Sequence, residues 1–209
     1  PSELELNIDK HKFYWHSKAD INENVQAANW HVLMDTVPTQ RQALYLQLAL
    51  WLRNLPSPIQ ETSLEQISTW AGRTTRIARP SHLPLNTKQL CELTKGGLVE
   101  IGAHTMTHPV LSALSADAQR WEINKSKQIL EEKLELPVTS FAYPFGSRTD
   151  YTANTVQLVK NAGFTCACSN FAGHIHGYGY SHPYQLPRYL VRNWDGDEFA
   201  CRLEHWFAS

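Results

Sequence analysis

From residue 86 onward, segments with helical periodicity alternate with short apolar segments typical of strands. The predicted helices cover residues 86–95, 115–136, 150–161 (starting at Asp150 or Thr152) and 198–207, and the predicted strands cover 99–101, 139–143, 164–169 and 189–192. Strands that alternate with helices in this way are typical of βα units, in which the strands lie parallel. We therefore expect an α/β fold.

The beginning of the chain has a different pattern. Apolar and polar residues alternate from residue 4 to 15 around a short polar turn, which predicts a β-hairpin with one apolar face. The spacing of the leucines predicts an amphipathic helix at 39–54, and a second helix is predicted at 62–71. We expect residues 1–75 to form a hairpin-plus-helices insertion that packs on a larger domain, residues 76–209.

Composition excludes some classes of function. The chain has 209 residues and is 42% hydrophobic, which is enough to form a hydrophobic core. Its net charge of -1 gives no basic face for nucleic acid. No apolar run reaches the roughly 18 residues of a membrane helix. The four cysteines form no Cys-x-x-Cys pair and are interpreted as small buried hydrophobes, which leaves the redox compartment undecided.

Two histidines follow the strand predicted at 99–101. Gly102 ends that strand, and three residues separate His104 from His108. In a helical turn the two side chains would lie on one face, where they can bind one Zn²⁺ at about 2.0–2.1 Å each. A catalytic zinc ion also needs a third protein ligand and an open position. Because α/β sites form at the carboxyl ends of strands, we interpret the pair as metal ligands; two solvated loop histidines are the alternative.

The run from Val99 to Pro109 resembles the second motif of the polysaccharide deacetylases, the family-four carbohydrate esterases, which reads His-Ser/Thr-x-x-His. Residues 141–146, Phe-Ala-Tyr-Pro-Phe-Gly, resemble the third motif of that family, Arg-x-Pro-Tyr/Phe-Gly. The resemblance covers roughly residues 85–209. It implies a distorted (β/α) barrel, hydrolytic removal of N-acetyl groups from a polysaccharide or oligosaccharide, and a Zn²⁺ or other divalent metal cofactor.

The resemblance also implies roles for residues of the two motifs. His104 and His108 would be metal ligands, and Thr105 would take the hydroxyl position between them or make a local turn bond. The backbone N–H of Phe145 would help to hold the oxyanion. Tyr143, Pro144 and Phe145 would wall a sugar groove; core packing is the rival interpretation for Tyr143.

The chain departs from the family in two of these roles. Ala142 stands where the family has an arginine, so Arg148 or Arg188 is expected to supply a guanidinium; an ordinary surface arginine is the alternative. The late histidine that the family uses as general acid has no clear match. Among the histidines of the loop before Leu186 we prefer His182, against the alternative of a solvated loop histidine.

The first motif of the family, two adjacent aspartates, has no counterpart, because the chain has no Asp-Asp pair. One of those aspartates is the catalytic base and the other binds the metal. We therefore expect the first βα unit to be missing, the barrel to be incomplete, and the chain by itself to be a poor enzyme. A non-catalytic carbohydrate- or metal-binding relative and a structural zinc domain are the alternatives. The family resemblance implies a cell-envelope or extracytoplasmic location.

Overall fold

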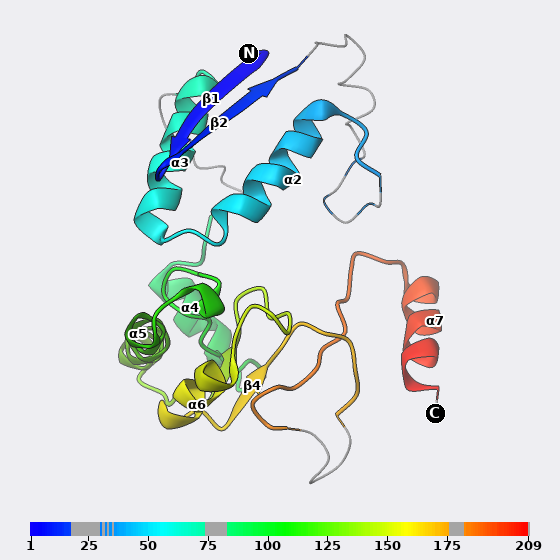
Figure 1. Cartoon of the computed structure of the whole chain (residues 1–209). Helices are drawn as coiled ribbons and strands as arrows, with labels where there is room; N and C mark the ends of the chain where they lie inside the picture. Colours follow the sequence, from blue (N-terminus) through cyan, green and yellow to red (C-terminus); the bar gives the residue numbers. More distant parts are fainter. Residues whose placement is uncertain are drawn as a thin grey trace.

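The computed structural model describes residues 1–17, 30, 32, 34, 36–73, 83–175 and 182–208. They form two parts: an N-terminal hairpin with two helices, and a C-terminal part in which helices surround a short parallel sheet (Figure 1). Each part contains its own cluster of buried hydrophobic residues. The two clusters support the division into residues 1–75 and 76–209, which stays a prediction.

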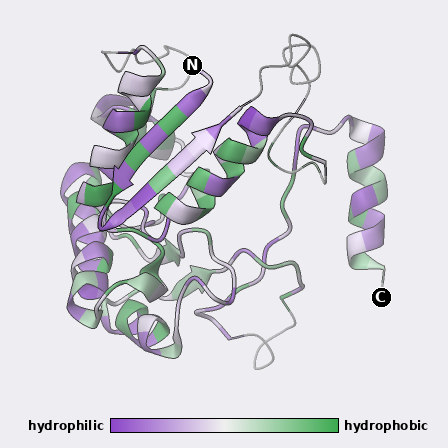
Figure 2. Cartoon of the chain, turned by 45° about the horizontal axis from the view of Figure 1, so that its top comes forward, coloured by the Kyte–Doolittle hydropathy of each residue, from purple (hydrophilic) through white to green (hydrophobic). Residues whose placement is uncertain are grey.

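The N-terminal part is a hairpin packed on two helices. Its elements are β1 (Glu3–Ile8), β2 (His11–His16), α2 (Gln40–Leu52) and α3 (Ser57–Trp70). The strands pair antiparallel, and alternate residues of β1 are buried, as the alternating colours of Figure 2 show. The core consists of Leu4, Leu6, Ile8, Leu44, Leu48 and Leu52. Each such side chain contributes about 1.5–3 kcal/mol when fully buried, so this shared apolar face stabilises the N-terminal part. The predicted hairpin and first helix are confirmed.

The prediction for the second helix was too short. α3 begins at Ser57 rather than at residue 62, directly after Pro56 at its N-cap position. Pro58 lies in the first turn, where no intrahelical partner for its missing N–H is required and its fixed φ suits the helix. The prolines therefore start α3 as well as separate it from α2.

In the C-terminal part, four extended segments lie side by side in the order of the chain. The named strands are β3 (Ser140–Ala142) and β4 (Cys166–Cys168), which pair parallel. On one side of them Ala103 bridges to Phe141, and on the other Leu186 bridges to Cys168, both parallel. Consecutive parallel segments joined by helices make an α/β barrel, and the sheet is not closed within the residues that the structure describes. The predicted fold class, an incomplete barrel, is confirmed.

Four helices precede, link or follow these segments. They are α4 (Thr87–Thr94), α5 (Ala116–Leu134), α6 (Ala153–Asn161) and α7 (Gly196–Phe207), with a 3₁₀ turn, η2 (Leu111–Ala113). The side chains of Asn86, Ser115, Thr152 and Asp195 accept hydrogen bonds from backbone N–H groups at the four helix starts. Such caps contribute about 1 kcal/mol each. The caps Asn86, Ser115 and Thr152 mark starts that the sequence predicts, whereas α7 begins two residues before the predicted start at residue 198.

Two predicted strands, 99–101 and 189–192, are not formed. In their places the structure has only the isolated bridges at Ala103 and Leu186. Leu98 is 95% exposed and Val99 is also exposed, and Pro187 has no N–H with which to continue a ladder. Within the described part of the chain, the open sheet therefore ends at these two bridges, and the predicted strands beside them stay unpaired.

α7 stands at the side of the barrel part (Figure 1), where Trp206 stacks on Tyr189 with ring centroids 4.5 Å apart. None of the helices in the described ranges combines the length and the apolar character required to cross a membrane.

Candidate functional site

The loop after Ala103 carries the two histidines at the carboxyl end of the first extended segment. His104 Nδ1 lies 2.7 Å from the carbonyl oxygen of Ala142. Because a carbonyl only accepts, Nδ1 carries the proton, and Nε2 keeps its lone pair for a metal or a proton. The ring centroids of His104 and His108 are 4.7 Å apart. The structure therefore brings the predicted pair together, with His104 in the tautomer that a metal ligand requires.

The backbone conformation that brings the two histidines together is not the predicted helical turn. Thr105 has φ 64° and His108 has φ 57°, which are left-handed values that few non-glycine residues adopt. The His108 N–H donates to Thr105 Oγ1 at 3.1 Å, so the Thr105 hydroxyl makes the local turn bond considered above. Two left-handed residues and this bond make a tight loop, not a helix.

A buried carboxylate holds the backbone of this loop in place through hydrogen bonds. Glu122, on α5, is 6% exposed and accepts hydrogen bonds from the backbone N–H of Met106 at 2.7 Å and of Thr107 at 3.0 Å. It also accepts from Thr107 Oγ1 at 2.6 Å. Sequence reasoning missed this residue; its only signal was an acidic residue beside the apolar stripe of α5, and a surface position explains that equally well.

The third-motif turn lies beside the histidine pair, as expected. It follows β3, and the Tyr143 N–H donates to the Cys168 carbonyl at 3.1 Å, which anchors it to β4. Phe145 has φ 58°, and its ring centroid lies 4.8 Å from that of His108. The turn and the histidines thus leave the sheet at one end. The direction of the Phe145 N–H stays a prediction.

A cavity of about 480 Å³ joins these groups. Its lining consists of His104, His108, Ala142, Tyr143, Phe145, Asn170, Arg188, Tyr189 and Leu190. Arg188 is held in place, because its Nε donates to the Ser169 carbonyl at 2.6 Å. The cavity is therefore lined by two imidazoles and by groups that can donate hydrogen bonds, such as Asn170 and Arg188.

The two residues before Phe145 contribute less than expected. Pro144 is buried and does not line the cavity. Tyr143 reaches the cavity wall, but its side chain is almost wholly buried, stacks on Tyr151 at 4.0 Å, and donates from its hydroxyl to the Tyr184 carbonyl. Burial raises the pKa of Tyr143, with further contributions from Tyr151 and Tyr184, so the phenol keeps its proton. These contacts favour core packing as the main task of Tyr143.

The other predicted residues lie elsewhere. His182 is exposed, accepts from the Tyr184 N–H at 3.3 Å, and does not line the cavity; its role as general acid stays a prediction. The guanidinium of Arg148 lies 4.1 Å from the centre of the Phe171 ring rather than at the histidine pair.

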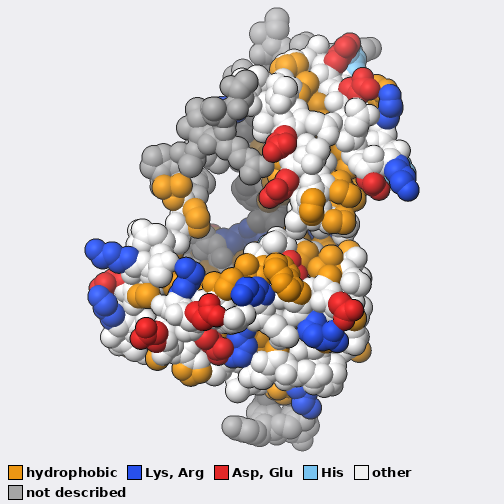
Figure 3. Space-filling model, turned by 90° about the vertical axis from the view of Figure 1, so that its left-hand side faces the viewer, with side chains coloured by type: hydrophobic (Ala, Val, Ile, Leu, Met, Phe, Trp, Pro, Cys, Tyr) orange, Lys and Arg blue, Asp and Glu red, His pale blue; other side chains and the backbone are white. Residues whose placement is uncertain are grey.

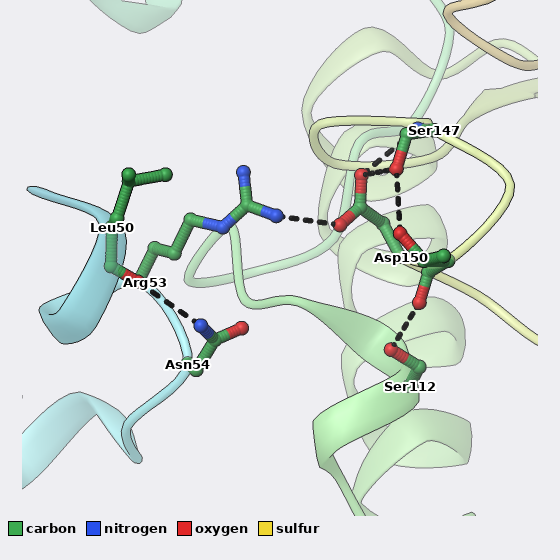
Figure 4. A network of polar contacts seen from close by, with 7 residues as sticks. Leu50, Arg53, Asn54, Ser112, Ser147 and Asp150 are labelled. Atoms are coloured by element: carbon green, nitrogen blue, oxygen red, sulfur yellow. Dashed lines mark hydrogen bonds and ion pairs between the residues drawn. The ribbon is translucent and has the colours of Figure 1, made fainter.

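A guanidinium from a different part of the chain also lies at the third motif. Arg53, at the end of α2, lies with its Cζ 4.8 Å from the centre of the Phe145 ring and pairs with Asp150 at 2.9 Å (Figure 4). Asp150 is 2% exposed, and its other oxygen accepts from the N–H of Ser147 at 2.9 Å and from its Oγ at 2.5 Å. Sequence reasoning missed Arg53, because 97 positions separate it from Asp150 and no local pattern marks the pair.

The histidine pair fits a metal site in part. Burial lowers the pKa of His108, and the charge of His104 lowers it further against a smaller raising effect of a backbone hydrogen bond. The neutral imidazole that results is the form that binds metal. In the described ranges, however, no group of three or more His, Cys, Asp or Glu side chains comes together. Catalytic zinc sites use three protein ligands, so the described residues offer an incomplete set.

Gly146 makes the end of the third-motif turn possible, and an alanine there should destabilise the protein. Gly146 has φ 75°, and an added Cβ would lie 2.9 Å from both Cβ and N of Asn170. We expect Gly146→Ala to lower the free energy of unfolding by about 1–3 kcal/mol or more, measured by urea denaturation. Gly163→Ala is the matched control, since Gly163 has φ 81° and open space around its Cα. Equal losses in both variants would show that the contact with Asn170 is unimportant.

Comparison with solved structures agrees with this architecture. The chain is similar to the Streptococcus pyogenes deacetylase PplD in complex with acetate, with 24% identity and a TM-score of 0.50 over 58% of this chain and 52% of that one. It is also similar to BC0361, a polysaccharide deacetylase from Bacillus cereus, with 20% identity and a TM-score of 0.50 over 67% of this chain and 47% of that one. The chain thus spans about half the length of these proteins. Fold and site together define an incomplete α/β barrel of the deacetylase type.

The profile of the polysaccharide deacetylase family matches residues 64–167, from within α3 to within β4, and includes both motifs. The chain belongs to the polysaccharide deacetylase family. No curated protein matches the chain in a sequence comparison.

Proposed function

We propose that the chain is part of a metal-dependent carbohydrate deacetylase, which removes N-acetyl groups from a polysaccharide or oligosaccharide by hydrolysis of the amide bond. The observation that carries this proposal is the convergence of His104, His108 and the Phe145 turn on one cavity. The two solved proteins described above bear the name deacetylase, which agrees with the family match.

The residues of the cavity suit different parts of the substrate. His104, through Nε2, and His108 would hold a divalent metal, best Zn²⁺; such an ion, when bound, lowers the pKa of water and polarises a carbonyl. The backbone N–H of Phe145 would donate to the oxyanion that forms on the amide carbonyl. Asn170 and Arg188, which also line the cavity, would bind sugar hydroxyls. His182 is the candidate for protonating the leaving amine, and it would have to move to reach the cavity.

The remaining ligand and the base are proposed to come from outside the described residues. No Asp or Glu is among the described residues that line the cavity. Asp150, the carboxylate nearest to the third motif in sequence, is buried and engaged by Arg53 and Ser147, so it is a poor candidate for the base. A non-catalytic metal- or carbohydrate-binding relative is the second candidate function, and the same lack of a carboxylate favours it.

Hydrolysis of acetylated glucosamine oligomers with added Zn²⁺ tests the proposal. We expect the 209-residue chain to release amine at a rate about 10²–10⁴-fold below that of the same chain with an aspartate-bearing strand added before Pro1, because a general base contributes about that factor. His104→Ala should remove the activity of both forms. Inactivity of both forms, with metal binding intact, would favour the non-catalytic relative, and equal strong activity would show that this chain already holds its base.

A further inference from the structure

A second cavity, of about 530 Å³, lies on the other side of the histidine loop. α2 and α3 provide most of its wall, through Tyr45, Leu48, Ala49, Leu52, Leu64 and Ile67. Figure 3 shows, on one face of the molecule, that hydrophobic side chains gather where the N-terminal part meets the barrel part. The size lies within the range of about 300–1,000 Å³ that is usual for ligand sites.

The spacing of the lining residues explains why this cavity is apolar. Residues 45, 48, 49 and 52 fall on one face of α2, and residues 64 and 67 fall on one face of α3, so two apolar stripes face each other. Two of the polar side chains in the wall already have partners. Arg53 pairs with Asp150 at 2.9 Å, and Gln60 Nε2 donates to the Leu55 carbonyl at 2.7 Å. The cavity therefore favours an alkyl group over a sugar.

The two cavities share a wall. His108 and Phe145 line both of them, so the place where the amide would react lies between a chamber with Asn170 and Arg188 and a chamber of leucines. An N-acylated amino sugar has the same division, because its amide joins a polar ring on the nitrogen side to an apolar chain on the carbonyl side. With the carbonyl at the shared wall, the ring occupies the first cavity and the chain enters the second.

We propose that the site accepts amino sugars whose N-acyl chain is longer than acetyl, and that the cavity between α2 and α3 binds this chain; the proposal rests on the deacetylase function proposed above. The reaction remains a hydrolysis. The C–N bond of the amide breaks, water gives its hydroxyl to the acyl carbon and a proton to the nitrogen, and the products are a fatty carboxylate and the free amino sugar. Neither an oxidant nor a second substrate is needed.

The test is calorimetric binding of N-acetyl-, N-butanoyl-, N-hexanoyl- and N-octanoylglucosamine to the full chain. Burial of one methylene raises affinity by up to about fourfold, so we expect a rise of at least tenfold from acetyl to hexanoyl and a plateau once the cavity is full. Ala49→Trp should remove this rise, because Ala49 lines the cavity while its side chain is outside the core. Ala43→Trp is the matched control, since Ala43 is exposed on α2 and does not line the cavity.

The possible outcomes separate this inference from the proposed function. An affinity that does not change with chain length, or an equal effect of Ala49→Trp and Ala43→Trp, overturns the inference even when acetylated oligomers are hydrolysed. An affinity that rises with chain length in the absence of any hydrolysis supports the cavity and counts against the deacetylase function. Octyl glucoside carries its chain on the anomeric carbon, and an equal gain with that probe would overturn the placement of the chain on the carbonyl side.

Discussion

The double variant His104→Ala/His108→Ala is expected to lose stoichiometric Zn²⁺ after dialysis. Among the described residues that line the 480 Å³ cavity, these two imidazoles are the only His, Cys, Asp or Glu side chains. Loss of an outer partner of a metal ligand typically costs about 10–100-fold in affinity, and loss of both ligands should cost more. Metal content measured by elemental analysis, with His205→Ala on α7 as the control, would check this. Unchanged zinc in the double variant would place the site elsewhere.

The pH dependence of zinc binding provides an independent check of the same site. A proton and a metal compete for an imidazole, and burial lowers the pKa of His108, so its neutral form persists to a lower pH than that of an exposed histidine. Protonation of His108 should therefore weaken zinc binding only at a pH below the ordinary range of histidine. The pH dependence of zinc binding, measured by titration calorimetry at several pH values, checks this expectation.

Arg53→Met is expected to be the most destabilising single change at the junction of the two parts. It leaves Asp150 buried without its cation, and breaking a buried ion pair in this way costs about 3–5 kcal/mol. The double variant Arg53→Met/Asp150→Asn should recover much of the loss, because the amide can still accept from Ser147 and carries no charge. Urea denaturation of the three proteins measures these differences.

The control for that experiment is Arg120→Met. Arg120 pairs with Asp117 at 2.5 Å, but both side chains are exposed, and surface pairs of this kind contribute only about 0–1 kcal/mol. Similar losses for Arg53→Met and Arg120→Met would mean that Asp150 tolerates the loss of its partner. The position of the third-motif turn would then be independent of α2.

The features that could be predicted from the sequence are local ones. The helix starts at Asn86, Ser115 and Thr152 depend on a side chain and a backbone N–H three residues away, so the sequence alone reveals them. The hairpin was likewise evident from the alternation in β1. The histidine pair was found because its spacing follows a strand end, although the helical turn expected there was wrong: the left-handed backbone of Thr105 and His108 leaves no trace in residue type.

The features that were missed depend on partners far apart in the chain. Glu122 meets the loop across 15 or 16 positions, and Arg53 meets Asp150 across 97. Neither contact has a periodicity, and each follows from how helices pack on the sheet. The two predicted strands that did not form lie at the open edges, where an apolar run has no neighbour within the described part of the chain to pair with. Strand propensity without a partner does not make a strand.

The hydrogen bonds between Glu122 and the histidine loop limit how this segment can vary in evolution. One carboxylate holds two successive N–H groups and a hydroxyl, so the number of residues between His104 and Thr107 is fixed by the geometry of a single side chain. An inserted or deleted residue would leave a buried charge with too few donors, whichever amino acid was involved. Relatives that keep the acidic residue on the helix should therefore keep the loop length, while the exposed side chain of Met106 remains free to diverge.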